Sequence, residues 1–173
     1  GHYPHAHNSF ETLLNNLQTI NPSPDPKDII ELQIQIGQIY RIQCQFKQAS
    51  KFLEEAYNLK KACEALQNDN NLETSILNEM IILHIDLAEY SQAEKLLDII
   101  KELQLNQPEV TLNHAKTYTN FALFYDKFAK EKDGLDMINK CLQIQLNFLP
   151  ENHIDFSETY NLRGELYLAL SKL

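Results

Sequence analysis

The chain has 173 residues, and its 43% hydrophobic and 23% charged residues are typical of a folded protein rather than a disordered one. Lysine and arginine total 15 against 24 aspartate and glutamate residues, so the net charge of -9 argues against nucleic acid as a partner. No run approaches the roughly 18 apolar residues of a membrane span, so a membrane is not expected as a partner either. Only four glycines and six prolines interrupt the chain, which favours long helices.

The first 28 residues are predicted to form a flexible N-terminus, a short helix and a proline-rich connector. Three histidines lie within residues 1–8, but no scaffold fixes their geometry there, so we expect no metal site. Apolar residues at helical spacing predict the short helix, namely Phe10, Leu13, Leu14 and Leu17. Residues 21–28 contain three prolines at alternate positions, which oppose helix propagation and predict an extended connector.

Residues 29–71 are predicted to form a pair of helices, the first from Ile29 to Cys44 and the second from Gln48 to about Gln67. Small residues on the facing sides let the two helices approach closely, and aromatic residues fill the space around the contact. The small residues are Gly37, Ala49 and Ala56, and the aromatic ones are Tyr40 and Phe46. The polar run 68–71 then ends the second helix.

The same spacing of small and apolar residues returns along the chain. Ala93 lies 44 residues after Ala49, Gly134 lies 41 residues after Ala93, and Gly164 lies 42 residues after Ala122. We therefore predict a repeat domain over residues 29–173. Its repeats are expected at 29–71, 72–107 and 108–150, followed by a half repeat at 151–173 that lacks its second helix.

The pattern Ile36-Gly37, Tyr40, Phe46, Ala49, Leu53 and Ala56 resembles the consensus of the tetratricopeptide repeat (TPR). That family's usual unit has about 34 residues, so the longer period here predicts longer helices. Repeats of this length resemble those of kinesin light chains, and the match is best from Leu149 to Gly164, with departures at Pro150, Ile154 and Leu162. The resemblance implies an all-α fold, a right-handed α-solenoid of antiparallel helix pairs forming a TPR-like superhelix.

The sequence contains none of the motifs that mark common catalytic or cofactor sites. A glycine-rich phosphate loop, His-Glu-x-x-His, paired Cys-x-x-Cys and a nucleophile elbow are all absent, so we expect neither an enzyme nor a cofactor. His84 takes a first-helix position equivalent to that of Tyr40, and we interpret it as a packed imidazole rather than a metal ligand. Three widely spaced cysteines are interpreted as reduced packing residues, namely Cys44, Cys63 and Cys141.

A stack of such helix pairs curves, and the first helix of each pair is expected to line its concave side. The repeat register predicts ten partner-binding positions in this groove, namely Ile34, Gln38, Arg41, Asn78, Ile82, Lys116, Thr119, Asn120, Asn161 and Glu165. Amide side chains both donate to and accept from a peptide backbone, which suits recognition of an extended segment. A carboxylate clamp like that of chaperone-binding TPR domains is not expected, because Ile34 and Gln38 take the clamp positions of the first repeat.

The function predicted from these observations is a cytoplasmic protein-protein interaction scaffold that binds a peptide or helical segment of another protein in its groove. Two alternatives stay open. One is a ligand-sensing regulatory segment of a larger signalling protein, since the chain starts at Gly1 and ends in a helical pattern, as an excised piece would. The other is a homotypic assembly module, in which the unpaired last helix near Tyr160 drives homo-oligomer formation.

Overall fold

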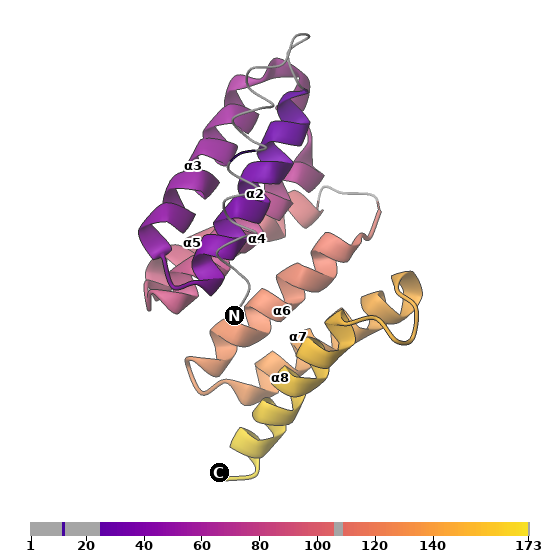
Figure 1. Ribbon diagram of the computed structural model, residues 1–173. Coiled ribbons are helices and arrows are strands. Elements are labelled where there is room, and N and C mark those ends of the chain that lie inside the picture. Colours follow the sequence, from indigo (N-terminus) through magenta and orange to yellow (C-terminus); the bar gives the residue numbers. More distant parts are fainter. Residues whose placement is uncertain (1–11, 13–24, 106–108, 173) are drawn as a thin grey trace. The chain divides into compact units, whose positions relative to one another are not determined.

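A computed structural model describes Thr12 and residues 25–105 and 109–172, and the regular structure of these residues is helical throughout (Figure 1). The predicted all-α class, with the helix pairs of an α-solenoid, is confirmed. The histidines of residues 1–8, the helix predicted after Ser9 and residues 21–24 of the connector lie outside the described residues. The helices are α2 (Pro26–Ile42), α3 (Phe46–Ala62), the 3-10 helix η1 (Glu64–Leu66), α4 (Asn70–Asp86), α5 (Tyr90–Leu105), α6 (Leu112–Asp126), α7 (Glu131–Phe148) and α8 (Asp155–Leu170).

The chain divides after Leu83 into two compact units. The first contains α2, α3, η1 and most of α4, and the second contains α5 to α8. Each unit is built from antiparallel helices joined by short turns, as the hairpins α2–α3 and α6–α7 show in Figure 1. Helices α6 and α7 lie within the predicted range 108–150, and α8 lies within 151–173, whereas the repeat boundaries themselves stay predictions.

Three helices start earlier than the sequence analysis predicted. One of them is α3, which begins at Phe46 rather than Gln48 and ends at Ala62 rather than near Gln67. Helix α2 begins at Pro26 rather than Ile29, because a proline in the first turn has no N–H that needs a partner and its φ already fits a helix. The Asp25 carboxylate caps this end by accepting from the Lys27 N–H at 2.9 Å. Helix α4 begins at Asn70, and the Asp69 carboxylate accepts from the Leu72 N–H at 2.9 Å. Residues 26–28 thus belong to a helix and not to an extended connector.

The close approach of α2 and α3 rests on the small residues that the sequence analysis selected. A Cβ atom added at Gly37 would lie 2.9 Å from Leu53 Cγ and 3.6 Å from the Ala49 carbonyl oxygen, so a larger residue at position 37 would push the helices apart. The Tyr40 ring stacks on Phe52 with ring centroids 5.5 Å apart. Ala49 and Leu53 are buried at this contact, which forms one apolar cluster of the first unit.

In the second unit α6, α7 and α8 pack around one apolar cluster that includes Ala122, Ile138 and Leu166. The Cys141 thiol of α7 lies 3.3 Å from the Thr119 hydroxyl of α6 and 3.8 Å from the Thr159 hydroxyl of α8. Burial raises the pKa of the Cys141 thiol, so it stays protonated. This confirms the packing role predicted for Cys141.

One turn geometry recurs in both units. Cys44, Ala88 and Ala129 have φ angles of 58°, 58° and 51°, in the left-handed region, and they follow one another at 44 and 41 residues. After each of them, the next N–H donates to a carbonyl five residues earlier, at 2.9 Å from Gln45 to Tyr40 and 2.8 Å from Glu89 to His84. The same bond, at 3.1 Å, joins Lys130 to Tyr125. This is a Schellman-type helix ending, and it repeats with the period read from the sequence.

Replacing Ala129 by glycine is expected to raise the free energy of unfolding by about 1 kcal/mol. A residue with a Cβ atom is strained in the left-handed region, whereas glycine adopts it freely. Urea denaturation followed by circular dichroism measures the change. Ala169→Gly in the last turn of α8 is the opposite case and should lower stability, by less than about 1 kcal/mol. A destabilised Ala129→Gly would show that the turn does not have the geometry described.

Candidate protein-interaction surface

Three of the ten predicted partner-binding residues are buried. Ile34 is 8% exposed and belongs to an apolar cluster with Ile30 and Ile76 in the first unit. Asn78 on α4 and Asn120 on α6 are both 0% exposed. A helix face that sequence spacing assigns to a groove can be covered by neighbouring side chains, and spacing alone does not reveal this. A role for these three residues in partner binding stays a prediction.

The other predicted residues of the first unit are partly accessible. Gln38 and Arg41 on α2 are half-buried, and so is Ile82 on α4. The fully exposed residues of α2 include Glu31 and Gln35, which lie on the same side of the helix, one turn apart. The polar surface of α2 therefore includes Glu31, Gln35 and the half-buried Gln38.

In the second unit the predicted residues divide between packing and surface positions. The Thr119 hydroxyl donates to the Ala115 carbonyl oxygen at 3.2 Å and also contacts Cys141 of α7, so this side chain is directed to the helix contact. Lys116 on α6 is half-buried, whereas Asn161 and Glu165 on α8 are exposed. Because α6 and α8 contact each other, these three polar residues belong to one adjacent pair of helices.

Helix α8 also has large exposed aromatic and apolar residues. Tyr160 is 51% exposed, Tyr167 is 49% exposed and Leu168 is 63% exposed. Gly164, one turn from each tyrosine, is exposed as well, and a Cβ atom added there would meet nothing within 4 Å. Helix α8 thus exposes aromatic and apolar side chains, and the homotypic assembly that the sequence analysis left open there stays a prediction.

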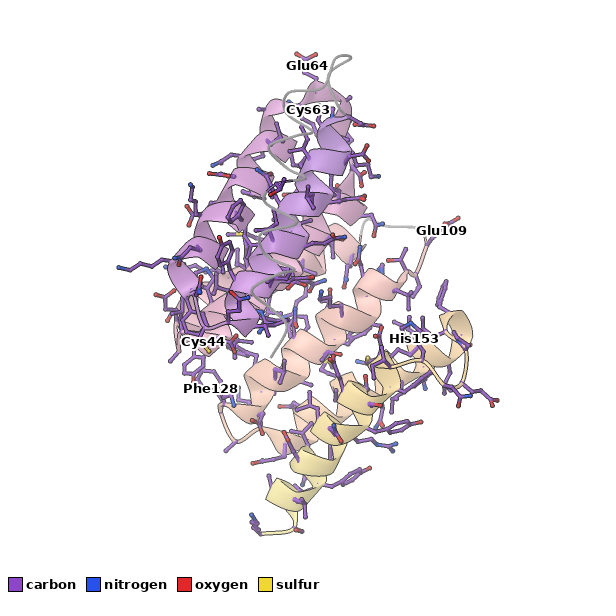
Figure 2. The ribbon with its side chains drawn as sticks, in the orientation of Figure 1. Cys44, Cys63, Glu64, Glu109, Phe128 and His153 are labelled. Atoms are coloured by element: carbon purple, nitrogen blue, oxygen red, sulfur yellow. The ribbon has the colours of Figure 1, made fainter. Side chains whose placement is uncertain are left out.

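Two of the three cysteines do not have the predicted packing role. Cys44 is exposed in the turn between α2 and α3, and Cys63 is half-buried just after α3, at the opposite end of this helix pair (Figure 2). The prediction failed because both residues follow the end of a helix rather than lying inside one. All three cysteines are free thiols.

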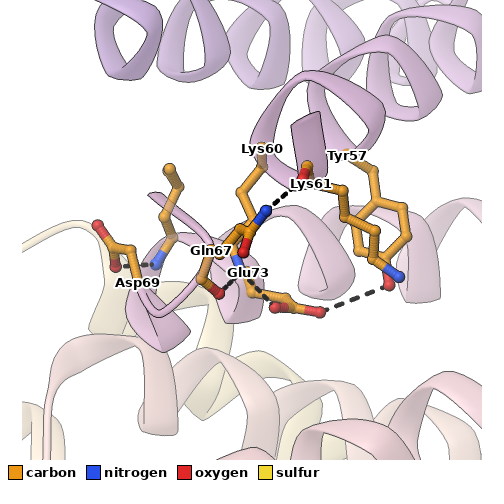
Figure 3. A network of polar contacts seen from close by, with 7 residues as sticks. Tyr57, Lys60, Lys61, Gln67, Asp69 and Glu73 are labelled. Carbon is orange, nitrogen blue, oxygen red and sulfur yellow. Dashed lines mark hydrogen bonds and ion pairs between the residues drawn. The ribbon is translucent and has the colours of Figure 1, made fainter. Parts of the chain in front are cut away.

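A buried lysine joins α3 to α4, and the sequence analysis did not identify it. Lys60 is 1% exposed, its ammonium group pairs with the Glu73 carboxylate at 2.5 Å, and it donates to the Gln67 carbonyl oxygen at 2.8 Å (Figure 3). The Tyr57 hydroxyl donates to the other oxygen of Glu73 at 3.4 Å. The spacing of the sequence could have indicated that Lys60 is buried, because it lies one turn after Ala56 on the buried side of α3.

The first turn of α6 contains a buried histidine. The Thr111 N–H donates to Nδ1 of His114 at 3.1 Å, so the imidazole closes the start of the helix as a glutamine does in a capping box. His114 is buried, and burial lowers the pKa of its imidazole. The neutral ring is the form that accepts from Thr111, because protonated Nδ1 has no free lone pair.

Acidification is expected to destabilise the fold through His114. The unfolded chain binds a proton at this histidine below about pH 6.5, whereas the folded chain binds it only at a lower pH, because burial lowers the pKa. The stability that the neutral His114 contributes is therefore present above the unfolded pKa and is lost as the pH falls toward the folded pKa. Urea denaturation at pH 7.5 and pH 5 measures the loss. His114→Gln keeps the capping geometry without titrating and should show a smaller loss. An equal loss in both proteins would contradict the prediction.

The described residues contain no group of three or more histidine, cysteine or acidic side chains that could hold a metal ion. His84 is half-buried, and its Nδ1 atom lies 2.7 Å from a Glu89 carboxylate oxygen, in agreement with the partly packed imidazole predicted for it. His153 lies in the turn between α7 and α8 (Figure 2), where its Nδ1 accepts from the Asp155 N–H at 3.3 Å. None of the described helices combines the length and apolar composition needed to cross a membrane.

Comparison with known proteins identifies a likeness in fold. The structure is similar to that of BtubC (BKLC) from P. vanneervenii, a kinesin-light-chain-like protein, with a TM-score of 0.71 and 21% sequence identity. The match covers 99% of this chain and 67% of the BtubC chain. No protein-family model and no curated protein matches the sequence. The chain thus has the fold of a TPR-like helical repeat protein.

Proposed function

We propose that this chain is a protein-interaction scaffold that binds a peptide or helical segment of another protein in the concave groove of its helix array. The observation that carries the proposal is the recurrent helix-turn-helix unit. Its turns have a residue in the left-handed backbone conformation at positions 44, 88 and 129. Repetition of one packing unit builds an extended surface rather than a single enclosed site, and such surfaces serve protein binding. The TPR-like fold supports this function, and no catalytic role is proposed.

The accessible polar residues of the second unit suit a peptide ligand. Lys116 can donate to peptide carbonyl groups, Glu165 can accept from peptide N–H groups, and the Asn161 amide can do both. All three come from the adjacent helices α6 and α8, and two of them are exposed. An extended peptide leaves both kinds of backbone group unpaired, so a surface with mixed donors and acceptors complements it.

Selection from a random-peptide display library tests this function. The wild-type chain is expected to enrich peptides that share a motif, and the variant Lys116→Ala with Glu165→Ala should bind those peptides about tenfold more weakly. Glu94→Ala with Lys95→Ala is the matched control, because it also removes one acidic and one basic side chain from an exposed position, on α5. Failure of the wild-type chain to enrich any motif, or equal binding by both variants, would contradict the proposal.

A further inference from the structure

One position in the last turn of each second helix is polar in all three copies, and we call it the junction position. It is Lys60 in α3, Gln104 in α5 and Gln145 in α7. Each lies 11 residues after the recurrent small residue of its helix, namely Ala49, Ala93 and Gly134. Lys60 is 1% exposed, Gln145 is 5% exposed and Gln104 is half-buried. Because a buried polar side chain is costly unless it is paired, its recurrence at one position indicates a role beyond filling space.

In two of the copies this side chain contacts the first helix that follows. Lys60 pairs with Glu73 of α4 at 2.5 Å, and the Gln104 amide donates to the Thr117 hydroxyl of α6 at 2.9 Å. The partner lies 13 residues later in both cases. The Thr117 hydroxyl also donates to the Asn113 carbonyl oxygen at 2.9 Å, so it both donates and accepts. The junction position thus links a second helix to the next first helix through one polar contact.

The two links meet the next helix at different turns. Counted back from the acceptor of the recurrent turn bond, Glu73 lies 11 residues before His84, whereas Thr117 lies eight residues before Tyr125. The residue of α4 that is equivalent to Thr117 is Ile76, which is buried in an apolar cluster. The junction position therefore contacts α4 about one turn earlier than it contacts α6. The repeat pattern of apolar residues does not account for this difference, whereas the place of the polar partner does.

A second ion pair holds the start of α4 from the other helix of the hairpin. The Lys27 ammonium of α2 lies 3.0 Å from the Asp69 carboxylate, which also caps α4 through the Leu72 N–H. Asp69 and Glu73 lie one turn apart, so α4 is paired with α2 and with α3 at neighbouring turns. The side chains of the Lys27 pair are 45% and 24% exposed, against 2% and 14% for the Lys60 pair. Solvent screens the outer pair more, so the buried pair is the stronger constraint.

A buried ion pair restricts how α4 can slide along the hairpin. Apolar contacts have little direction, so apolar helix faces alone tolerate a shift of one turn. Such a shift in one direction would put Ile76 beside Lys60 and leave the ammonium without a carboxylate, which is strongly unfavourable. A shift in the other direction would bring Asp69 to Lys60 but remove it from Lys27. Only the observed register satisfies both lysines.

We propose that Lys60 determines the register of α4: its pairing with Glu73 selects one position of α4 on the α2–α3 hairpin, which apolar packing alone leaves open. The hydrogen bond from Gln104 to Thr117 does the same for α6 on α5 through a weaker, uncharged contact. Gln145 does not have this role, because its Oε1 atom is buried with no hydrogen-bond partner among the described residues. The inference concerns the geometry within each unit and does not depend on the proposed peptide binding.

NMR relaxation dispersion on the intact, 15N-labelled chain tests the proposal, because it detects a second register that exchanges in microseconds to milliseconds. In Lys60→Met with Glu73→Leu, two apolar side chains replace the pair, and the protein is expected to stay folded. The population of a second state of α4 should nevertheless rise about tenfold or more over wild type. Asp98→Leu with Lys101→Met removes an exposed pair on α5, and it should leave the resonances of α4 unchanged.

The second junction provides an independent variant, and the third provides a matched control. In Gln104→Leu with Thr117→Val the population of a second state of α6 should rise about threefold. Gln145→Leu removes the amide whose oxygen has no partner, so α8 should show no added dispersion.

Two results would overturn the proposal. One is a folded Lys60→Met, Glu73→Leu variant with a single state of α4 or, if circular dichroism shows that this variant is unfolded, a single state of α6 in Gln104→Leu with Thr117→Val. The other is dispersion in α8 of Gln145→Leu as large as that in α4 of the Lys60 variant, because loss of a polar side chain without a partner would then have the same effect.

Discussion

Replacing Glu73 by alanine is expected to lower the free energy of unfolding by about 3 kcal/mol, because it leaves the Lys60 ammonium buried without its counter-charge. The Lys60 side chain is 2% exposed and that of Glu73 is 14% exposed, so water screens the pair poorly. The Gln67 carbonyl, 2.8 Å from the ammonium nitrogen, would remain as an acceptor but carries no full charge. Urea denaturation followed by circular dichroism measures the loss.

Two control variants test whether the loss of stability in Glu73→Ala comes from the burial of this ion pair, rather than from the loss of any ion pair. Asp98→Ala removes an exposed pair with Lys101, and it should cost less than about 0.5 kcal/mol because solvent screens that contact. The double variant Lys60→Met with Glu73→Leu should recover most of the stability lost in Glu73→Ala, since two apolar side chains fill the space without desolvated charges. A change smaller than about 1 kcal/mol in Glu73→Ala would mean that the ion pair is solvated in the folded protein.

Replacing Tyr40 by alanine is expected to cost about 3 kcal/mol, because it opens a cavity between α2 and α3. The Tyr40 ring is 5% exposed and stacks on Phe52, and it belongs to the apolar cluster that includes Ala49 and Leu53. Close packing makes the loss of a ring costly, since the surrounding backbone cannot collapse fully into the space. Thermal and urea denaturation both report the change.

Tyr167→Ala is the matched control for this prediction, because Tyr167 takes the same repeat position in α8. That ring is 49% exposed, so its removal should cost less than about 1 kcal/mol. The difference between the two variants measures what a covering helix contributes at this position. Equal losses would show that Tyr167 is packed in solution, and Tyr40→Ala at wild-type stability would contradict the repeat register itself.

The helix pairs were predictable because the spacing of small and apolar residues is a property of the sequence. Gly37 and Ala49 lie at the helix contact where the pattern placed them, and Gly134 lies at the equivalent contact of α7. The left-handed turns were not predicted, since alanine and cysteine take positions where glycine would have been the usual signal. There the hydrogen bonds of the helix ending outweigh the strain of a Cβ atom in that region.

The candidate site was predicted less well than the fold. Spacing assigns a residue to one side of a helix but does not say which neighbouring helix covers that side, and Ile34, Asn78 and Asn120 are buried for this reason. Lys60 was not identified, because the repeat pattern consists of small and apolar residues and a lysine is rarely buried, although Lys60 continues the buried side of α3. Its partner Glu73 is far enough along the chain that only the fold brings the two together.

The sequence by itself determined the all-helical class, the period of 41 to 44 residues and the small residues at the hairpin contacts, because each of these follows from local spacing along one chain. Only the tertiary structure decided which equivalent residues are packed and which are free. Gly37 and Gly164 hold the same repeat position, yet a Cβ atom added at Gly37 would lie 2.9 Å from Leu53, whereas one added at Gly164 would have no neighbour within 4 Å. The physical reason is that burial depends on the helix that covers a residue, and that helix comes from elsewhere in the chain.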